Sequence, residues 1–182
     1  MTHEAPPPER EATPPADLPL PYLARISEYY QTLGFGAPYR WAHFAEVPYT
    51  PLRKPLQDCR VGLVTTAAPY QPDKGEQGPG APYNASAKFF QVYSGDTAQD
   101  PDLRISHIGY DRHHTTATDA EVWFPLRALR RAQAAGVIGE LAPRFHGAPT
   151  NRSHRTTLDV DGPEILQRCR DDGVDCVVLV AV

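Results

Sequence analysis

Two apolar runs in the chain predict buried β-strands. Residues 60–66, Arg-Val-Gly-Leu-Val-Thr-Thr, are apolar almost throughout, as expected of a strand covered on both faces. Residues 175–182, Asp-Cys-Val-Val-Leu-Val-Ala-Val, show the same pattern in the last part of the sequence. Residues 103–108 instead alternate apolar and polar positions, which predicts a third strand nearer the edge of a sheet.

Apolar residues at helical spacing predict two helices that lie before and between these strands. The first covers residues 21–33. The second starts at Pro125, carries Leu126 and Leu129 on its inner face, and ends at Gly136.

A capping-box pattern predicts the start of a third helix. Asp161 is followed three residues later by Glu164, which is the spacing at which the two side chains bond each other's backbone. The inner face of this helix is predicted to carry Ile165, Leu166 and Cys169.

The order of these elements predicts an α/β fold. It is best satisfied by a three-layer, mainly parallel sheet with helices on both faces. Residues 1–19 are expected to form a disordered, proline-rich tail, because seven of the 20 prolines lie in the first 21 residues. Residues 20–182 are then a single α/β domain, with a loop rich in Pro, Gly, Asn and Gln at residues 69–86.

The composition argues against two classes of partner. A formal net charge of −4 over 182 residues gives no basic footprint for nucleic acid or an anionic membrane surface. No apolar run approaches the roughly 20 residues that span a bilayer.

The three cysteines form no C-x-x-C pair, which favours a reducing compartment. We therefore expect a cytoplasmic protein that binds neither nucleic acid nor membrane.

Thr65 and Thr66 lie at the carboxyl end of the first predicted strand. In a parallel sheet this is the rim at which ligands bind, so both residues are candidates for substrate binding. The alternative is that threonine is simply a favourable residue at the end of a strand.

A loop between a strand and a helix contains two adjacent histidines, His113 and His114. Imidazoles there could move protons near neutral pH, which makes both histidines candidate catalytic residues. They do not have the spacing of a zinc site, and no H-E-x-x-H motif or cysteine cluster supports one, so no metal is predicted.

Residues 141–150 give no clear secondary-structure pattern, and residues 144–152 read as a loop that carries several polar side chains. Arg144 and Arg152 could clamp a carboxylate in a bidentate fashion, with His146 beside them, so all three are candidate substrate-binding residues. A solvated loop is the alternative.

A series of short motifs lies across residues 48–182. They are Pro48–Leu52, Lys54–Leu56, Val61–Ala67, Ser94–Asp96, Asp102–Arg104, Phe124–Leu129, Gly136–Gly139, Gly162–Glu164 and Asp172–Leu179. Each motif is modest, but in their order and spacing together they resemble the selenoprotein B subunit family of D-proline reductase and of glycine/sarcosine/betaine reductase.

The resemblance implies a reductive cleavage of a C–N bond in an amino acid or betaine-like substrate. It implies a redox centre just after the strand that matches residues 175–180, formed by a selenocysteine or a cysteine. We therefore expect a selenocysteine beyond the C-terminus, and a chain that is the N-terminal portion of a longer protein, truncated at a UGA codon and inactive as given.

The resemblance also implies partners. These are a reductase partner subunit, whose pyruvoyl group activates the amine, a thiol electron donor, and an amino acid-like small molecule. In this setting His113 or His114 is the expected proton donor. The alternative interpretation is a non-catalytic scaffold or small-molecule-binding subunit of a reductase complex. The chain itself is expected to carry no cofactor.

Overall fold

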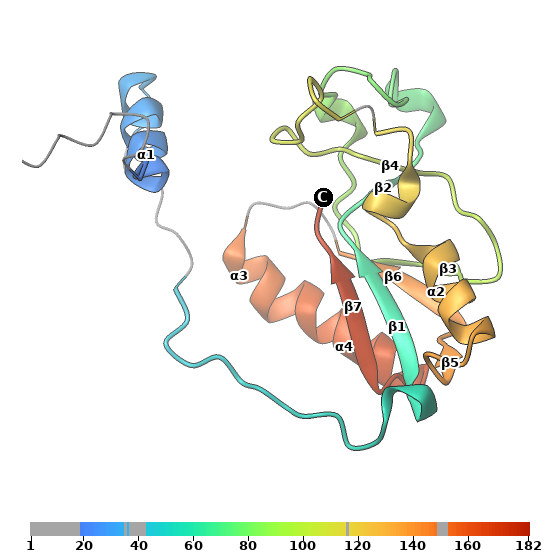
Figure 1. Ribbon diagram of the computed structural model, residues 1–182. Helices are drawn as coiled ribbons and strands as arrows, with labels where there is room; N and C mark the ends of the chain where they lie inside the picture. The colour runs from blue at the N-terminus through green and yellow to red at the C-terminus, as the bar shows by residue number, and fades with distance from the viewer. Residues whose placement is uncertain (1–18, 35, 37–42, 116, 149–152) are drawn as a thin grey trace, which may run out of the picture. The chain divides into compact units, whose positions relative to one another are not determined.

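The computed structural model describes residues 19–34, 36, 43–115, 117–148 and 153–182 (Figure 1). The chain divides into two compact units, residues 1–47 and 48–182. The first unit contains the predicted N-terminal helix, α1 (Tyr22–Thr32), none of whose residues is buried. The predicted disordered tail, residues 1–19, lies outside the described residues except for Pro19.

The second unit contains a mixed sheet built around β1 (Arg60–Thr65). The strand β7 (Cys176–Val180) pairs in parallel with β1 along one edge. The short strands β5 (Glu140–Leu141) and β6 (Arg144–Gly147) pair in parallel with the start and end of β1, and β3 (Tyr93–Asp96) runs antiparallel to β6. The predicted α/β class is confirmed, whereas the three-layer arrangement stays a prediction.

The strand β7 is an edge strand, so the prediction that residues 175–182 are a buried strand is wrong. Within the described residues β7 pairs with β1 alone. Alternate side chains, among them Val178 and Val180, pack against the core. The side chains between them point away from it, and Val177 and Leu179 are 43% and 67% exposed. An apolar sequence alone does not distinguish a strand covered on one face from one covered on both.

The predicted strand over residues 103–108 is much shorter than expected. Only β4 (Leu103–Arg104) is extended, and it pairs antiparallel with β2 (Ala68–Pro69) in a separate two-stranded sheet. After Arg104 the carbonyl groups of Ile105 and His107 accept hydrogen bonds from the guanidinium of Arg112. A side chain thus takes the place of a neighbouring strand.

The prediction that residues 144–152 form a loop is wrong for their first half, because β6 lies between β1 and β3. Phe145 and His146 are both 1% exposed although they point to opposite faces of the sheet. Phe145 packs against Phe124 in the largest buried cluster, which also contains Leu126. His146 meets Asp172, which follows the last helix.

Two glycines in the β3–β6 pair lie directly under aromatic rings. Gly147 is opposite Tyr93 and Gly95 is opposite Phe145. A Cβ atom built on either glycine would overlap the facing ring. The strands can therefore approach only because these positions lack a side chain.

Replacing Gly147 with alanine is therefore expected to lower the free energy of unfolding by about 2 kcal/mol, since overpacking a filled site forces its neighbours to shift. Urea denaturation measures the change. The same substitution in a Tyr93→Ala chain should have a much smaller effect, because the clashing ring is gone. An equal loss in both backgrounds would contradict the clash.

The last helical segment begins earlier than predicted. It consists of α3 (His154–Thr156), a π-helical segment η6 (Thr157–Asp161) and α4 (Gly162–Asp171). Its cap is Ser153, whose hydroxyl accepts a hydrogen bond from the Thr156 amide. Asp161 lies inside the helix and makes no capping bond, so the predicted capping box is wrong.

The predicted inner face of α4 is right only in part. Cys169 is buried, but Leu166 is 50% exposed.

The helix α2 (Leu126–Ala134) begins just after Pro125 as expected, and Leu126 is buried as predicted. Single turns of 3-10 helix occur at η2 (Leu56–Asp58), η3 (Pro72–Lys74), η4 (Ala85–Ala87) and η5 (Ala120–Val122).

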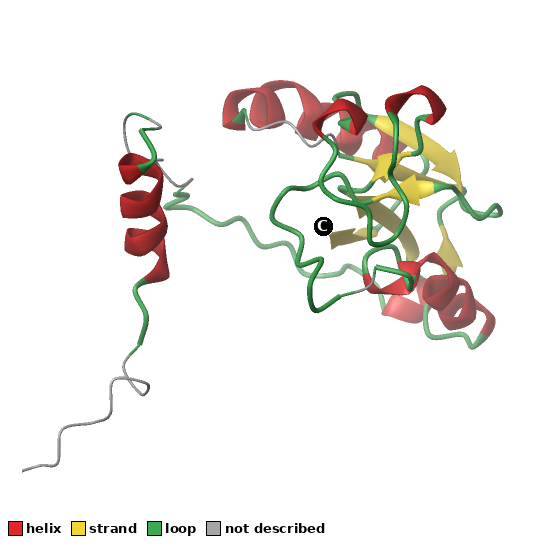
Figure 2. Ribbon diagram, turned by 90° about the horizontal axis from the view of Figure 1, so that it is seen from above, coloured by secondary structure: helices red, strands yellow, loops and turns green. Residues whose placement is uncertain are grey.

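Loops lie over the carboxyl ends of β1 and β7, as the view from above shows (Figure 2). In the described part of the chain, no helix combines the length and the apolar character that a membrane span requires.

Candidate functional site

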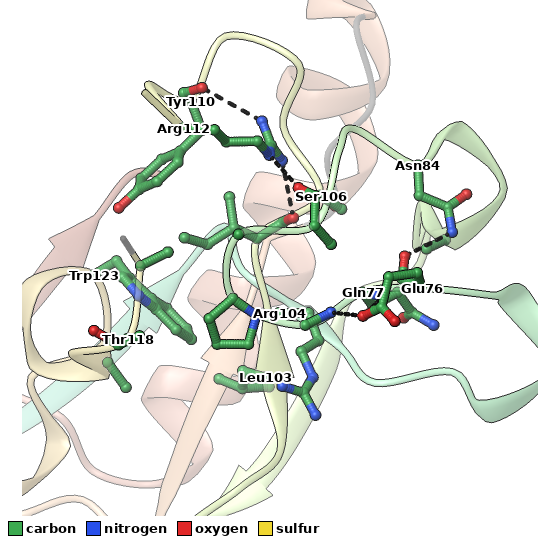
Figure 3. Close-up of a pocket in the computed structure, with 18 of the residues that line it drawn as sticks. Glu76, Gln77, Asn84, Leu103, Arg104, Ser106, Tyr110, Arg112, Thr118 and Trp123 are labelled. Atoms are coloured by element: carbon green, nitrogen blue, oxygen red, sulfur yellow. Dashed lines mark hydrogen bonds between the residues drawn. The ribbon is translucent and has the colours of Figure 1, made fainter. Parts of the chain in front are cut away.

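A cavity of about 170 Å³ lies among the loops that follow the carboxyl end of β1 (Figure 3). Its walls come from residues 76–87, 101–112 and 117–124. Three of the lining residues belong to the same buried cluster as Leu63 of β1, namely Leu103, Trp123 and Phe124. The cavity therefore lies at the edge of the sheet where open α/β proteins bind ligands.

Four polar atoms on the residues around this cavity are buried and have no hydrogen-bond partner among the described residues. They are Arg104 Nε, Ser106 Oγ, Tyr110 OH and Trp123 Nε1. Buried polar groups are nearly always paired, so a group of such atoms around one cavity calls for an explanation.

The loop 105–112 is held in place by Arg112, which also lines the cavity. Its guanidinium donates to the carbonyl groups of Ala81, Ile105, His107 and Tyr110 at 3.0 to 3.4 Å. These bonds tie the loop to the glycine-rich segment opposite.

The two predicted catalytic histidines lie on an exposed turn next to this loop. The amides of His113 and His114 both donate to Asp111 Oδ1, and His114 Nδ1 lies 2.8 Å from Asp111 Oδ2. These bonds, led by the one from the His114 amide, lower the pKa of Asp111. Among the described residues, neither histidine lines the cavity.

Thr65 and Thr66 lie at the carboxyl end of β1, as predicted, but their hydroxyl groups bond to the chain itself. Thr65 Oγ1 is buried, accepts a hydrogen bond from the Ala67 amide and donates to the Trp123 carbonyl. Thr66 Oγ1 accepts from the Val182 amide at 2.7 Å. Thr65 thus positions a residue of the cavity wall, and substrate contact by either threonine stays a prediction.

Two of the predicted substrate-binding residues, Arg144 and His146, converge on one buried carboxylate. Arg144 donates to both oxygens of Asp172 at 2.8 to 3.2 Å, which raises the pKa of Arg144. His146 Nε2 lies 3.2 Å from Asp172 Oδ2. The third predicted residue, Arg152, lies outside the described residues.

The hydrogen bonds around His146 define its tautomer. Ser94 Oγ accepts from Arg168 at 2.7 Å, so its own proton is available to His146 Nδ1 at 2.8 Å. The ring proton then sits on Nε2, facing Asp172. Burial lowers the pKa of His146, and this outweighs the opposing effect of Asp172. The cluster fastens β3 and β6 to the end of α4, and substrate binding by these side chains stays a prediction.

The lowered pKa of His146 predicts how stability depends on pH. The unfolded chain binds a proton near pH 6.5, whereas the folded chain resists it, so stability is complete above pH 6.5 and declines as the pH falls below it. Urea denaturation between about pH 8 and pH 5 measures this slope. A His146→Gln variant should flatten it, and an unchanged slope would contradict the assignment.

Within the described residues, no group of three or more His, Cys, Asp and Glu side chains is placed to hold a metal ion. The cysteines are poorly suited to nucleophilic chemistry. Cys59 is 1% exposed, and burial raises the pKa of the Cys169 and Cys176 thiols.

The second unit is therefore an α/β domain with a cavity of ligand size beyond the carboxyl end of its central strand. Comparison with known proteins identifies its family. Residues 28–182 match the family described as glycine/sarcosine/betaine reductase selenoprotein B, and the chain belongs to this family. The resemblance predicted from the motifs is confirmed.

Three relatives are similar to most of this chain. It is 32% identical over 136 residues to the D-proline reductase subunit gamma of Acetoanaerobium sticklandii, covering 73% of this chain and 52% of the relative. It is 27% identical over 150 residues to the sarcosine reductase complex component B subunit beta of Peptoclostridium acidaminophilum, covering 81% and 33%. It is 28% identical over 144 residues to the glycine reductase complex component B subunit gamma of Carboxydothermus hydrogenoformans, covering 76% and 31%.

The chain thus spans between about a third and about half of the length of these relatives. No solved structure is significantly similar to it.

The residues around the cavity were missed by the sequence analysis. Ser106, Tyr110, Arg112 and Trp123 form no motif of characteristic spacing. The one available signal was the long loop at residues 69–86, since ligand sites often lie on loops carried by a rigid sheet.

Proposed function

We propose that this chain is a subunit of a cytoplasmic amino acid reductase complex. The observation that carries the proposal is the family match over residues 28–182, supported by three relatives that are named as reductase subunits or components. The three cysteines are free thiols, as expected of a protein in a reducing compartment.

The proposed reaction is the reductive cleavage of a C–N bond in an amino acid or betaine-like substrate, with a thiol as electron donor. It needs a nucleophile that is ionised near neutral pH. Cys59 and Cys169 are buried, and desolvation raises the pKa of the partly buried Cys176 thiol, which argues against all three thiols of this chain. We therefore place the nucleophile, a selenocysteine or a reactive cysteine, outside residues 1–182. A pyruvoyl group on the partner subunit would supply the carbonyl that activates the amine.

The test is to read the source DNA beyond codon 182 and to assay the protein that it encodes. We expect a UGA codon followed by an open frame that encodes a nearby cysteine. The extended protein, combined with its partner subunit and a dithiol, should then consume D-proline, sarcosine, glycine or betaine. A UAA or UAG codon with no frame after it, together with no activity in the complex, would overturn the catalytic proposal.

A non-catalytic subunit that binds a small molecule is the second candidate. The burial of Cys59 and Cys169 favours it, as does the cavity with its unpartnered polar atoms. It predicts that the 182-residue chain alone is a stable, monodisperse protein. Gel filtration with light scattering measures this, and an aggregated product would count against it.

A further inference from the structure

Three side chains at the junction of β3, β6 and the end of α4 are connected in the order serine, histidine, carboxylate. Ser94 and His146 lie directly opposite each other in the β3–β6 pair, with Ser94 Oγ 2.8 Å from His146 Nδ1. On the other side of the ring, His146 Nε2 lies 3.2 Å from Asp172 Oδ2. A serine that is linked in this way to a base and an orienting carboxylate can act as a nucleophile, and such a group is recognised by its geometry rather than by its positions in the sequence.

The protons in this group lie where nucleophilic catalysis requires them. Ser94 Oγ accepts a hydrogen bond from Arg168 Nη1 at 2.7 Å, which leaves the hydroxyl proton for His146 Nδ1. The ring proton is then on Nε2 and faces Asp172. Burial lowers the pKa of His146, so the ring is neutral near pH 7 and Nδ1 is able to accept a proton. His146 is therefore placed as a general base for Ser94.

The contact between His146 and Asp172 is the loosest of the three. The geometry at Nε2 does not complete a hydrogen bond within the described chain, although Asp172 Oδ2 is the acceptor that the nitrogen faces. Arg144 donates to both oxygens of Asp172 and so holds the carboxylate in place. A proton that arrives on Nδ1 makes the ring cationic, and a charge-assisted bond to Asp172 is shorter and stronger than a neutral one. Catalytic hydrogen bonds in free enzymes are often long and tighten only during the reaction.

Ser94 is more accessible than its two partners. His146 and Asp172 are buried, whereas Ser94 is partly exposed. Ser94 lies on β3, which pairs with β6 alone among the described residues, so the serine is approached from the edge of the sheet. Arg168 lies beside the serine and also pairs with Glu164 at 2.6 Å. Its guanidinium supplies positive charge next to the oxygen on which negative charge develops during an attack.

We propose that Ser94 is a nucleophile that takes an acyl group from a small ester, with His146 as general base and Asp172 as the positioning residue. Ser94 Oγ attacks the carbonyl carbon while its proton passes to His146 Nδ1. The bond between the carbonyl carbon and the leaving oxygen then breaks, and the leaving alcohol takes this proton. Water attacks the acyl-serine with the same base and releases the carboxylic acid and the free serine. This activity does not depend on the reductase function proposed above.

Acetylation by p-nitrophenyl acetate tests the proposal in the unaltered 182-residue chain. The ester is mixed with the protein, the reaction is stopped with acid, and tryptic peptides are analysed by mass spectrometry. The peptide of residues 89–104 contains Ser94 and no lysine, so an acetyl group on it is not a lysine adduct. We expect the acetyl group on Ser94. Its rate of formation should be constant from about pH 8 to pH 6.5 and decline only below pH 6.5, where His146 gains a proton.

Two substitutions test the proposed roles, and circular dichroism checks that each variant is folded. Ser94→Ala removes the nucleophile and should abolish the adduct. His146→Gln removes the base and should slow acetylation about a hundredfold, as expected for loss of general base catalysis. Ser86→Ala is the matched control, because Ser86 is an exposed serine whose hydroxyl bonds to the Lys74 carbonyl, and this variant should be acetylated on Ser94 at the unaltered rate.

The proposal is overturned if the 89–104 peptide carries no acetyl group, or if fragmentation places the group on Tyr93 or Thr97. A rate that rises in proportion to hydroxide between about pH 7 and pH 9 also overturns it, because that is the behaviour of a serine without a general base. So does a folded His146→Gln variant that reacts as fast as the unaltered chain. The first two results come from the unaltered protein and therefore decide the matter even where a variant fails to fold.

Discussion

Replacement of Phe145 by alanine is expected to lower the free energy of unfolding by about 4 kcal/mol. Phe145 is 1% exposed and lies at the centre of the largest buried cluster, with its ring 4.8 Å from that of Phe124. The substitution opens a cavity between β6 and α2 that the surrounding residues cannot fill. Single domains have about 5 to 15 kcal/mol in total, so this variant should be close to unfolding.

Urea denaturation followed by circular dichroism measures this loss. Phe90→Ala is the matched control, because the Phe90 side chain is 60% exposed and its removal should change stability little. A loss below about 1 kcal/mol at Phe145 would contradict its place in the core.

Replacement of Asp172 by asparagine is expected to cost about 3 kcal/mol. The Asp172 side chain is 7% exposed and accepts hydrogen bonds from Arg144, with His146 Nε2 at 3.2 Å. Asparagine keeps one acceptor oxygen but replaces the other with an NH2 donor and removes the charge, so the half-buried Arg144 guanidinium and the buried imidazole lose the carboxylate that both face. We expect this loss of stability to come from a weaker attachment of the end of α4 to the sheet.

The neighbouring carboxylate provides the control for this prediction. Asp171 is exposed and accepts one hydrogen bond from Gln167 on the same helix, so Asp171→Asn should change stability by no more than about 0.5 kcal/mol. Equal losses for the two variants would show that the Asp172 cluster does not hold the helix in place.

The sequence was sufficient for elements whose signals are local. The strand β1 is a continuous apolar run, and α2 has a proline before it and a glycine after it. Such signals lie within a few residues of the element itself. The family motifs belong to the same category, because they depend on order and spacing along the chain.

The strand β6 could not be predicted, because what makes it a strand lies elsewhere in the chain. A buried histidine is tolerated there only because Ser94 and Asp172 supply its polar partners. Ser94 is 52 positions away along the sequence. No local pattern of apolar residues marks such a strand.

The cavity was hidden for a similar reason. Ser106, Tyr110 and Trp123 come together because Arg112 folds its loop back and Thr65 holds the Trp123 carbonyl. These contacts are specific to the folded chain. Residue types at the strand ends could indicate the edge of the sheet but not the loop that lies over it.

The π-helical segment η6 changes how this chain should be compared with its relatives. A π turn holds one residue more than an α turn, and Pro163 just after it cannot donate the amide hydrogen bond of a regular helix. One extra residue rotates all later positions by about 100°, and the wide turn absorbs that rotation. A relative that lacks one residue between 157 and 161 would still present Cys169 and Asp172 to the sheet. A single-residue gap in an alignment at this point therefore marks a change of helical pitch, and the two chains remain equivalent on either side of it.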